Sequence, residues 1–461
     1  MTRRFVTALL ALVLASCAMG PDYERPKVPV QETWRMTEKE GESIANMRWW
    51  ELLLDDELHT LIRIALEENK DLQRAVASVE EFQARLFIAR TNFAPQINAD
   101  ANAPSFGRLK GARIPGFPTP FSYSGQGHLS WELDFWGRVR RENEAARADL
   151  LAQEENRRAV VLQLVAGVAQ AYFDLRQLDM QLDITRRTLQ SWEESVRISR
   201  ARLRQGLTPK LDADQFEAEW ANATARAAEL ERQMVQKENE LSVLLGRNPI
   251  QIPRGRALTE QVMPPAVPAG LPSDLLQRRP DILQSEQQLA AATARIGVAK
   301  AERFPQITLT GLLGVASPQL SSLGSSEYAV AGVALAGPLL NAQTLGFQQE
   351  AAEAQARQAL AHYQQTILVA FKEVEDALVA VRTARQQIEA QETQVAALRS
   401  ALHLADLRYK GGVSNYLDVL IAQRSLFDAE LALVTTRRLH LVSVVQLYKA
   451  LGGGWNEKGA S

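Results

Sequence analysis

The residue best placed for covalent chemistry is Cys17, the only cysteine among the 461 residues. It follows a basic start at Arg3, an apolar run over residues 5–14 and two small residues. This order is typical of an export signal, because the run is shorter than the about 20 residues that a membrane-spanning helix needs. Since Cys17 stands where such a signal is cleaved, we predict that residues 1–16 are removed and that Cys17 carries lipid. The alternative is an ordinary cleaved signal with an incidental cysteine. Ala18 follows it, where an aspartate would favour the inner membrane, so we expect an outer-membrane location.

Two acidic residues stand in matching positions. Asp212 follows Gly206 by six residues, and Asp418 follows Gly412 by the same distance. Each glycine ends a long Pro-free run, which predicts a helix closed by a left-handed glycine. Each acid then falls in the first turn of the next helix, a placement that typically stabilises a helix by about 0.3–1 kcal/mol.

The rest of the sequence offers little for catalysis. The five histidines are scattered, and none has the spacing of a metal site. The glycine run at residues 452–454 lacks the Lys-Ser/Thr of a phosphate loop, and no nucleophile is organised with a base. A formal net charge of -2 provides no basic surface for nucleic acid. We therefore predict a protein that is not an enzyme, holds no cofactor or metal and binds no nucleic acid.

The chain repeats itself once. Pro95-Gln96-Ile97 returns as Pro305-Gln306-Ile307, and later landmarks such as Gly206 return 206 positions on. A repeat this long predicts a duplicated domain rather than a solenoid. The Pro-rich stretch from Asn248 to Pro272 is interpreted as the linker between the two copies.

Each copy is predicted to contain a helix, two strands, a very long helix, a tight turn and a returning helix. The first helix should run from Glu57 to Asn92, and the strand candidates are residues 97–103, 123–133, 307–315 and 328–336. The Pro-free runs at about 138–204 and 343–410 would each form a helix on the order of 100 Å long. Heptad stripes, with members such as Leu178, Leu182 and Trp192, predict antiparallel coiled-coil hairpins.

Four strands per chain are too few to close a membrane barrel, which needs about eight. An open sheet has unsatisfied edges and cannot sit in lipid. Residues 123–133 alternate between apolar and polar side chains, as the wall of a water-filled pore would. We therefore expect the strands to pair with those of other chains, and three chains would supply twelve.

The chain resembles the outer membrane factor family, the TolC-like exit ducts of tripartite efflux and type I secretion systems. Its closest likeness is to the lipoprotein branch that serves resistance-nodulation-division (RND) pumps. The motifs that carry the resemblance are Met19-Gly20-Pro21-Asp22-Tyr23-Glu24-Arg25-Pro26, Trp49-Trp50, Trp131-Glu132-Leu133-Asp134-Phe135-Trp136-Gly137-Arg138 and Arg408-Tyr409-Lys410-Gly411-Gly412-Val413-Ser414-Asn415-Tyr416-Leu417-Asp418-Val419-Leu420.

This resemblance implies a mainly α fold with a small β part, built from a duplicated repeat of long coiled-coil hairpins plus two strand pairs. It implies a homotrimer with a 12-stranded β-barrel in the outer membrane, joined to a periplasmic α-helical barrel. Substrates would be handed over by an inner-membrane RND-type pump through a periplasmic adaptor and pass through the duct passively. The chain would contact outer-membrane lipid.

The resemblance also implies roles for the tips of the two hairpins. The tip residues expected to dock the adaptor are Gly206, Leu207, Thr208, Gly412, Val413 and Ser414. A gate at the periplasmic mouth would involve Asp212, Tyr409 and Asp418, with Tyr409 contacting Asp212. The family often carries a second acid three residues after Asp418, where this chain has Ile421, which puts a double acidic ring in doubt.

The predicted organisation has six parts: a signal peptide (1–16), a lipidated segment (17–57), repeat 1 (58–250), a linker (251–273), repeat 2 (274–452) and a tail (453–461). Two alternatives stand beside the efflux duct. One is a type I secretion duct, and the other is a lipid-anchored periplasmic scaffold or pump adaptor. An adaptor would show one hairpin flanked by split lipoyl-like halves, whereas this chain has two copies with strand pairs in each. A hydrolase on a helical scaffold has no supporting motif.

Overall fold

The computed structural model describes residues 18–31, 33–35, 53–103, 123–261, 272–317, 319–325, 327–338, 342–411, 413–414 and 416–453. These residues form two compact units. One combines residues 1–28, 77–155 and 284–365 and contains the strands; the other combines residues 29–76, 156–283 and 366–461. Within the described ranges, none of the helices combines the length and the apolar content that crossing a bilayer requires.

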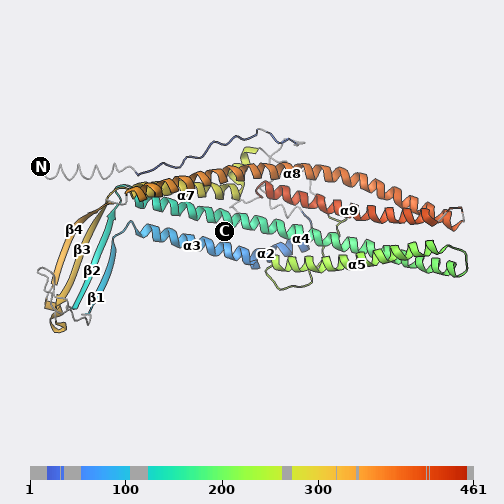
Figure 1. Cartoon of the computed structure of the whole chain (residues 1–461), viewed down its shortest axis with the longest axis horizontal. Coiled ribbons are helices and arrows are strands. Elements are labelled where there is room, and N and C mark those ends of the chain that lie inside the picture. The colour runs from blue at the N-terminus through green and yellow to red at the C-terminus, as the bar shows by residue number, and fades with distance from the viewer. Residues whose placement is uncertain are drawn as a thin grey trace. The chain divides into compact units, whose positions relative to one another are not determined.

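The duplicated element order is present in the structure (Figure 1). The first copy contains α2 (Asp56–Glu68), α3 (Lys70–Thr91), β1 (Gln96–Asn102), β2 (Tyr123–Leu133), α4 (Arg138–Arg204) and α5 (Lys210–Leu244). The second contains η3 (Pro272–Asp274), α6 (Leu275–Arg278), α7 (Pro280–Ala301), β3 (Gln306–Ser317), η4 (Leu320–Ser325), β4 (Glu327–Ala336), α8 (Ala342–Lys410) and α9 (Tyr416–Ala450).

The four strands form a single antiparallel sheet in the order β1-β2-β3-β4, and the four predicted strands are confirmed to within two residues at each end. β2 pairs with β3, so the sheet joins the two copies. The register places apolar side chains opposite one another, as in Trp131 with Leu309 and Leu309 with Val333. The intervening positions include polar pairs, as in Ser130 with Thr310 and Asp100 with Gln126, beside apolar ones such as Leu312 with Val330. The sheet therefore has an apolar face and a more polar face, as the alternation predicted.

The prediction of one helix from Glu57 to Asn92 is wrong, because the helix is interrupted at Asn69. The backbone of Asn69 is extended, with ψ at 131°. Its side-chain oxygen accepts from the N–H of Leu72 (2.9 Å), and its amide donates to the carbonyl of Leu244 (2.8 Å). The side chain thus caps the new helix and ties it to the end of α5, which offsets the lost continuity.

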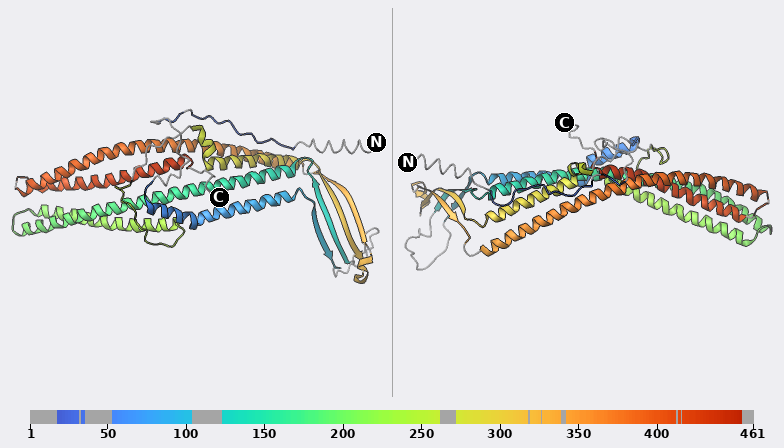
Figure 2. Two further views of the ribbon diagram at one scale, coloured as in Figure 1. Left: turned by 180° about the vertical axis from the view of Figure 1, so that it is seen from behind. Right: turned by 90° about the horizontal axis from the view of Figure 1, so that it is seen from above.

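Two long helical hairpins make up most of the second unit. α4 begins and ends as predicted, at Arg138 and Arg204, and α8 begins one residue earlier than predicted. α5 returns beside α4 and α9 beside α8 in every view (Figures 1 and 2). The heptad residues Leu178 and Leu182 pack with Ala227 and Leu230 in one buried cluster, which places the predicted stripe at the helix–helix seam.

The same glycine cap closes three helices within the described ranges. Gly206 and Gly246 have φ values of 70° and 74°, and Gly452 has φ 87°. The residue after each donates its N–H to a carbonyl five residues earlier, as Leu207 does to Arg202 (3.0 Å), which is the Schellman arrangement. Val413 makes the same bond to Arg408 (2.9 Å) at the fourth position, where Gly412 itself lies outside the described residues.

These caps give a matched pair of glycine variants. A Cβ at Gly246 would lie 2.2 Å from the carbonyl oxygen of Glu68, whereas at Gly206 it would meet nothing within 4 Å. Gly206→Ala should cost only the left-handed strain of about 1–2 kcal/mol. Gly246→Ala should cost about 1–3 kcal/mol more, because backbone must move. Thermal unfolding of the two purified variants in detergent measures this, and equal losses of stability would contradict it.

Candidate functional site at the hairpin tips

The first tip presents an apolar residue directly after its glycine cap. Gly206 is exposed, and the left-handed turn it forms projects Leu207, whose side chain is 70% exposed. Thr208 is half-buried beside it. An exposed leucine held by a rigid turn is suited to contact another protein. Burying its side chain against a partner would be favourable, and the turn that carries it needs no further ordering.

The second tip repeats this arrangement. Val413 follows the corresponding cap and is 73% exposed. The hydroxyl oxygen of Ser414 is buried and has no hydrogen-bond partner among the described residues. Each hairpin therefore ends in one exposed aliphatic side chain at the same position relative to its cap.

An aromatic cluster joins the two hairpins just behind the tips. Phe216 of α5 lies 3.9 Å from Tyr416 of α9, measured between ring centroids, and Trp192 of α4 lies 6.2 Å from Phe216. Tyr409 of α8 meets the Tyr416 ring edge to face at 5.0 Å. Since all four long helices contribute to this cluster, the two tips are held against each other by packing.

Tyr409 makes a second link between the hairpins. Its hydroxyl accepts a hydrogen bond from the guanidinium of Arg202, in the last turn of α4. The Arg202 guanidinium carbon also lies 5.1 Å from the centroid of the Tyr409 ring, within range of a cation–π contact. The partner shown for Tyr409 is therefore Arg202, which the resemblance did not imply. Arg202 is a residue that the sequence did not single out, because nothing local in the sequence links it to a tyrosine 207 positions away.

Asp212 is half-buried in the first turn of α5, close enough to influence the aromatic cluster. Burial raises the pKa of the Tyr416 hydroxyl, and the charges on Tyr409, Asp212 and Asp406 raise that pKa further, while Ser195 acts in the opposite direction. The Ser195 hydroxyl donates instead to the Ser191 carbonyl (2.9 Å), so Tyr416 has no partner of good geometry among the described residues.

Asp418 stands apart from the cluster. It is exposed in the first turn of α9, and Ile421, one turn further, is exposed as well. The start of α9 therefore exposes one acid, Asp418, and carries the apolar Ile421 where the resemblance would place a second acid.

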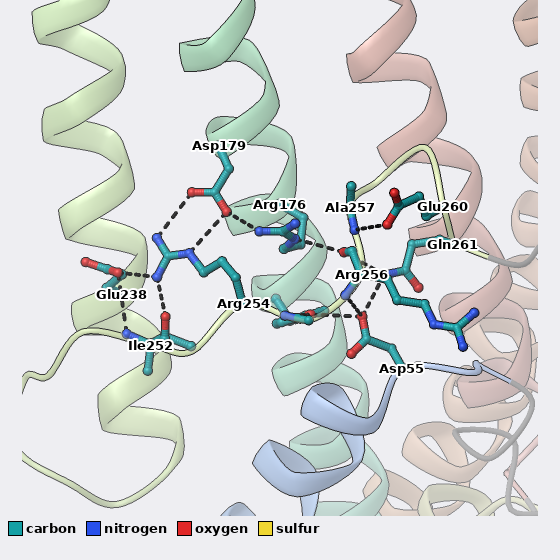
Figure 3. A network of polar contacts seen from close by, with 12 residues as sticks. Asp55, Arg176, Asp179, Glu238, Ile252, Arg254, Arg256, Ala257, Glu260 and Gln261 are labelled. Atoms are coloured by element: carbon teal, nitrogen blue, oxygen red, sulfur yellow. Dashed lines mark hydrogen bonds and ion pairs between the residues drawn. The ribbon is translucent and has the colours of Figure 1, made fainter.

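Residues 252–261 of the linker make specific contacts within the second unit. The sequence indicated only a Pro-rich connection at this place. Arg254 donates to Asp179 of α4 (3.1 Å) and to Glu238 of α5, so it bridges the two helices of the first hairpin (Figure 3). Arg176 binds the same Asp179 (2.7 Å) and the carbonyl of Arg256 (3.0 Å). We call residues 252–261 and these partners the linker clamp.

Asp55 forms the other half of the linker clamp. Its carboxylate is buried, and it accepts from the Tyr172 hydroxyl (2.9 Å), the Gln261 amide (2.7 Å) and the Arg256 N–H (3.1 Å), while also capping α2. Burial, followed by this carboxylate, raises the pKa of Tyr172. A Cβ at Gly255 would lie 2.2 Å from a carboxylate oxygen of Asp55, so a larger residue there would displace the Asp55 side chain. The clamp therefore joins α4 and α5 at the base of the first hairpin.

The N-terminal segment is held by specific contacts in the first unit. Arg141, almost wholly buried, donates to the carboxylate of Asp22 (2.6 Å), and Met19 donates its N–H to the Trp136 carbonyl (3.0 Å). Tyr23 and Arg25 both donate to Glu286 of α7. Cys17 lies outside the described residues, but its neighbour Ala18 lies so close to Gly137 that a Cβ there would be 2.7 Å from it.

Comparison with known proteins identifies this architecture. The sequence profile described as outer membrane efflux protein matches residues 61–247 and 271–453. The chain is 34% identical over 455 residues to the cation efflux system protein CusC of Escherichia coli, covering 97% of this chain and 98% of that protein. It is 36% identical over 462 residues to the outer membrane protein OprJ of Pseudomonas aeruginosa, covering 97% and 95%.

A solved structure gives the same answer for the fold. The MtrE outer membrane channel of Neisseria gonorrhoeae aligns with a TM-score of 0.84 and 34% identity, over 95% of this chain and 98% of that one. The resemblance found in the sequence is confirmed, as is the predicted mainly helical fold with a small sheet. The function predicted from the sequence, an outer-membrane efflux duct, and the outer-membrane location are confirmed as well. The chain belongs to the outer membrane efflux protein family.

Proposed function

We propose that three copies of this chain form the exit duct of a tripartite efflux system, fed by an inner-membrane RND-type pump through a periplasmic adaptor. The observation that carries the proposal is the pair of equivalent tips, each closed by the same backbone hydrogen bond to the preceding helix and each presenting one exposed aliphatic residue. A rigid tip suits a duct of this kind, since the adaptor would have to bind the hairpin tips in the periplasm, away from either membrane.

The trimer is supported by the sheet. β1 and β4 are its edges, and the sheet has one apolar and one more polar face. Strand edges in lipid require partners, and twelve strands from three chains would satisfy them in one barrel. The apolar face would then meet lipid and the other face would line the pore.

We also propose that Cys17 carries the lipid anchor. Ala18 is seated at Gly137, between β2 and α4, so an acyl chain on the preceding residue would be held at the strand-to-helix junction. The barrel would hold the trimer in the membrane, and the lipid would fix the N-terminal segment to it.

Mass spectrometry of the N-terminal peptide tests the anchor. Purified mature protein should begin at Cys17 and carry the mass of the attached acyl groups. Cys17→Ser should leave the peptide without that mass, which makes it the matched control. A mature chain that starts elsewhere, or an unmodified Cys17, would overturn the proposal.

The tips are proposed to dock the adaptor through Gly206, Leu207 and Thr208 at one hairpin and Gly412, Val413 and Ser414 at the other. Gly206→Asp adds charge beside Leu207 without a clash at Cβ, because that position faces open space. Adaptor affinity should fall by about tenfold, the equivalent of about 1.4 kcal/mol. Binding of the purified adaptor to immobilised trimer measures this.

Gly206→Ala is the matched control, since it introduces the same backbone strain without the charge. It should bind the adaptor almost as well as the parent, and both variants should remain trimeric in native mass measurements. If Gly206→Asp retained full adaptor affinity, the first tip would have no docking role.

We propose that Asp212, Tyr409 and Asp418 belong to a gate at the periplasmic mouth. Asp418 from three chains would converge there, and like charges at close range repel. The closed state therefore needs a contact that holds it, and the contact between Arg202 and Tyr409 is suited to this, because it joins the outgoing helices of both hairpins.

Single-channel conductance tests this contact. Tyr409→Phe keeps the ring but removes the hydroxyl, and Arg202→Gln removes the charge, so each should raise the open fraction of the channel. Tyr409→Phe removes only the hydrogen bond, whereas Arg202→Gln removes the guanidinium that makes both the hydrogen bond and the cation–π contact, so Arg202→Gln should have the larger effect. The double variant should add little to Arg202→Gln, because that substitution has already removed both contacts. Arg204→Gln, an exposed neighbour in the same last turn, serves as the control. Additive effects, or an Arg204→Gln effect of equal size, would place the gate elsewhere.

A further inference from the structure

The N-terminal segment lies in a site that both copies of the repeat build. Gly20 crosses α7 at Gly297, where a Cβ on Gly20 would lie 2.5 Å from the Gly297 Cα atom. Arg141 of α4 donates to the carbonyl of Met19 (3.1 Å), and a Cβ on Gly297 would lie 2.8 Å from the Arg141 Cγ atom. α4 belongs to the first copy and α7 to the second. We call residues 19–25 the strap, and its site is complete only when α4 and α7 are packed together.

The strap also neutralises a buried acid. Glu286 of α7 is 7% exposed, and Tyr23 donates to one of its carboxylate oxygens (3.2 Å). Arg25 donates to the same oxygen through Nε (2.8 Å) and to the second oxygen through a terminal nitrogen. Burial and then the Glu286 charge raise the pKa of the Tyr363 hydroxyl on α8, while Arg25 lowers that pKa. Departure of the strap would take these partners from a buried charge, which is strongly unfavourable.

The first copy differs from the second at the two positions that the strap needs most. α3 and α7 each contain 22 residues and begin 210 positions apart, at 70 and 280. Glu286 therefore corresponds to Val76, and Gly297 corresponds to Phe87. Val76 is 38% exposed and Phe87 is 53% exposed. A valine could not pair with Arg25, and a phenylalanine at the crossing would collide with the strap, so the second copy alone has the residues that fit it.

We infer that the strap is a latch, which docks once the two copies have packed together and then holds α4 of the first copy to α7 of the second. The order follows from the site, because Arg141 and Gly297 come from different copies and meet only in the packed chain. The strap begins two residues after Cys17, so the same docking fixes the place of the residue proposed to carry lipid. The latch acts within one chain and does not depend on the proposed trimer.

Cleavage by endoproteinase Lys-C tests the latch in the full-length protein in detergent. Lys27 is exposed and lies two residues beyond the strap. A protease needs several residues of locally unfolded chain around the bond that it cuts, so the rate of cleavage after Lys27 measures how often the strap is undocked. Arg25→Gln should raise this rate by about tenfold, because it removes hydrogen bonds between two charged groups. Intact mass measurement identifies the cut.

Arg295→Gln is the matched control for this measurement. Arg295 makes an ion pair between α7 and α4 as well, but its partner is Asp149 and not the strap. The rate of cleavage after Lys27 should therefore stay within about twofold of the parent rate. An unchanged rate in Arg25→Gln, or an equal increase in Arg295→Gln, would overturn the latch.

Thermal unfolding of Gly297→Ala gives an independent test at the other end of the strap. Alanine inside a helix ordinarily stabilises it relative to glycine, but here the Cβ would lie 2.6 Å from the Met19 carbonyl oxygen. The unfolding temperature should therefore fall. Gly167→Ala in α4, where a Cβ would meet nothing within 4 Å, should raise it. A rise in both variants would show that α7 does not hold the strap at Gly297, and would overturn the latch as well.

Discussion

The open backbone edges of the four-stranded sheet are the constraint on which the rest of the structure depends. β1 and β4 each present N–H and C=O groups on a side where the described chain supplies no strand. Such groups are costly to leave unsatisfied away from water. The pairing of β2 with β3 already joins the two copies through backbone hydrogen bonds, so the same kind of junction between chains of the proposed trimer would satisfy the edges without a new type of contact.

Duplication makes the two hairpins equivalent, and the differences between them show where each copy has specialised. The Schellman caps repeat at Gly206 and Gly246 and again in the second copy, so the length of each hairpin is fixed by backbone geometry. The linker clamp belongs to the first hairpin alone, where Arg254 bridges Asp179 and Glu238. Arg279 occupies a comparable place at the second, where it donates to Glu373 and to the carbonyl of Ala450. Each hairpin is therefore held at its base by a guanidinium, through different partners.

The sequence predicted those features that depend on local pattern. Alternation located the strands, and the absence of proline located α4 and α8, because both are properties of neighbouring residues. The break at Asn69 was missed, since asparagine is tolerated inside helices and the contact that ties its side chain to the end of α5 is made with Leu244, 175 positions away. Residues 252–261 had the composition of a loop and gave no sign of the clamp. For the same reason Arg202 could not be connected with Tyr409, although both the tips and the tyrosine were predicted.

The contact between Arg202 and Tyr409 is small, but its position multiplies its effect. A cation–π contact that is partly exposed contributes about 0.5–1 kcal/mol. In the proposed trimer each chain supplies one such contact, so the closed mouth would gain about 1.5–3 kcal/mol, or roughly one to two powers of ten in the closed-to-open ratio. A stabilisation of this size would keep the proposed gate closed at rest. A docking partner would open the gate if its preference for the open state exceeded that stabilisation slightly. Asp418 is exposed, and in the proposed trimer repulsion among three such acids would oppose closure and keep the closed and open states close in energy.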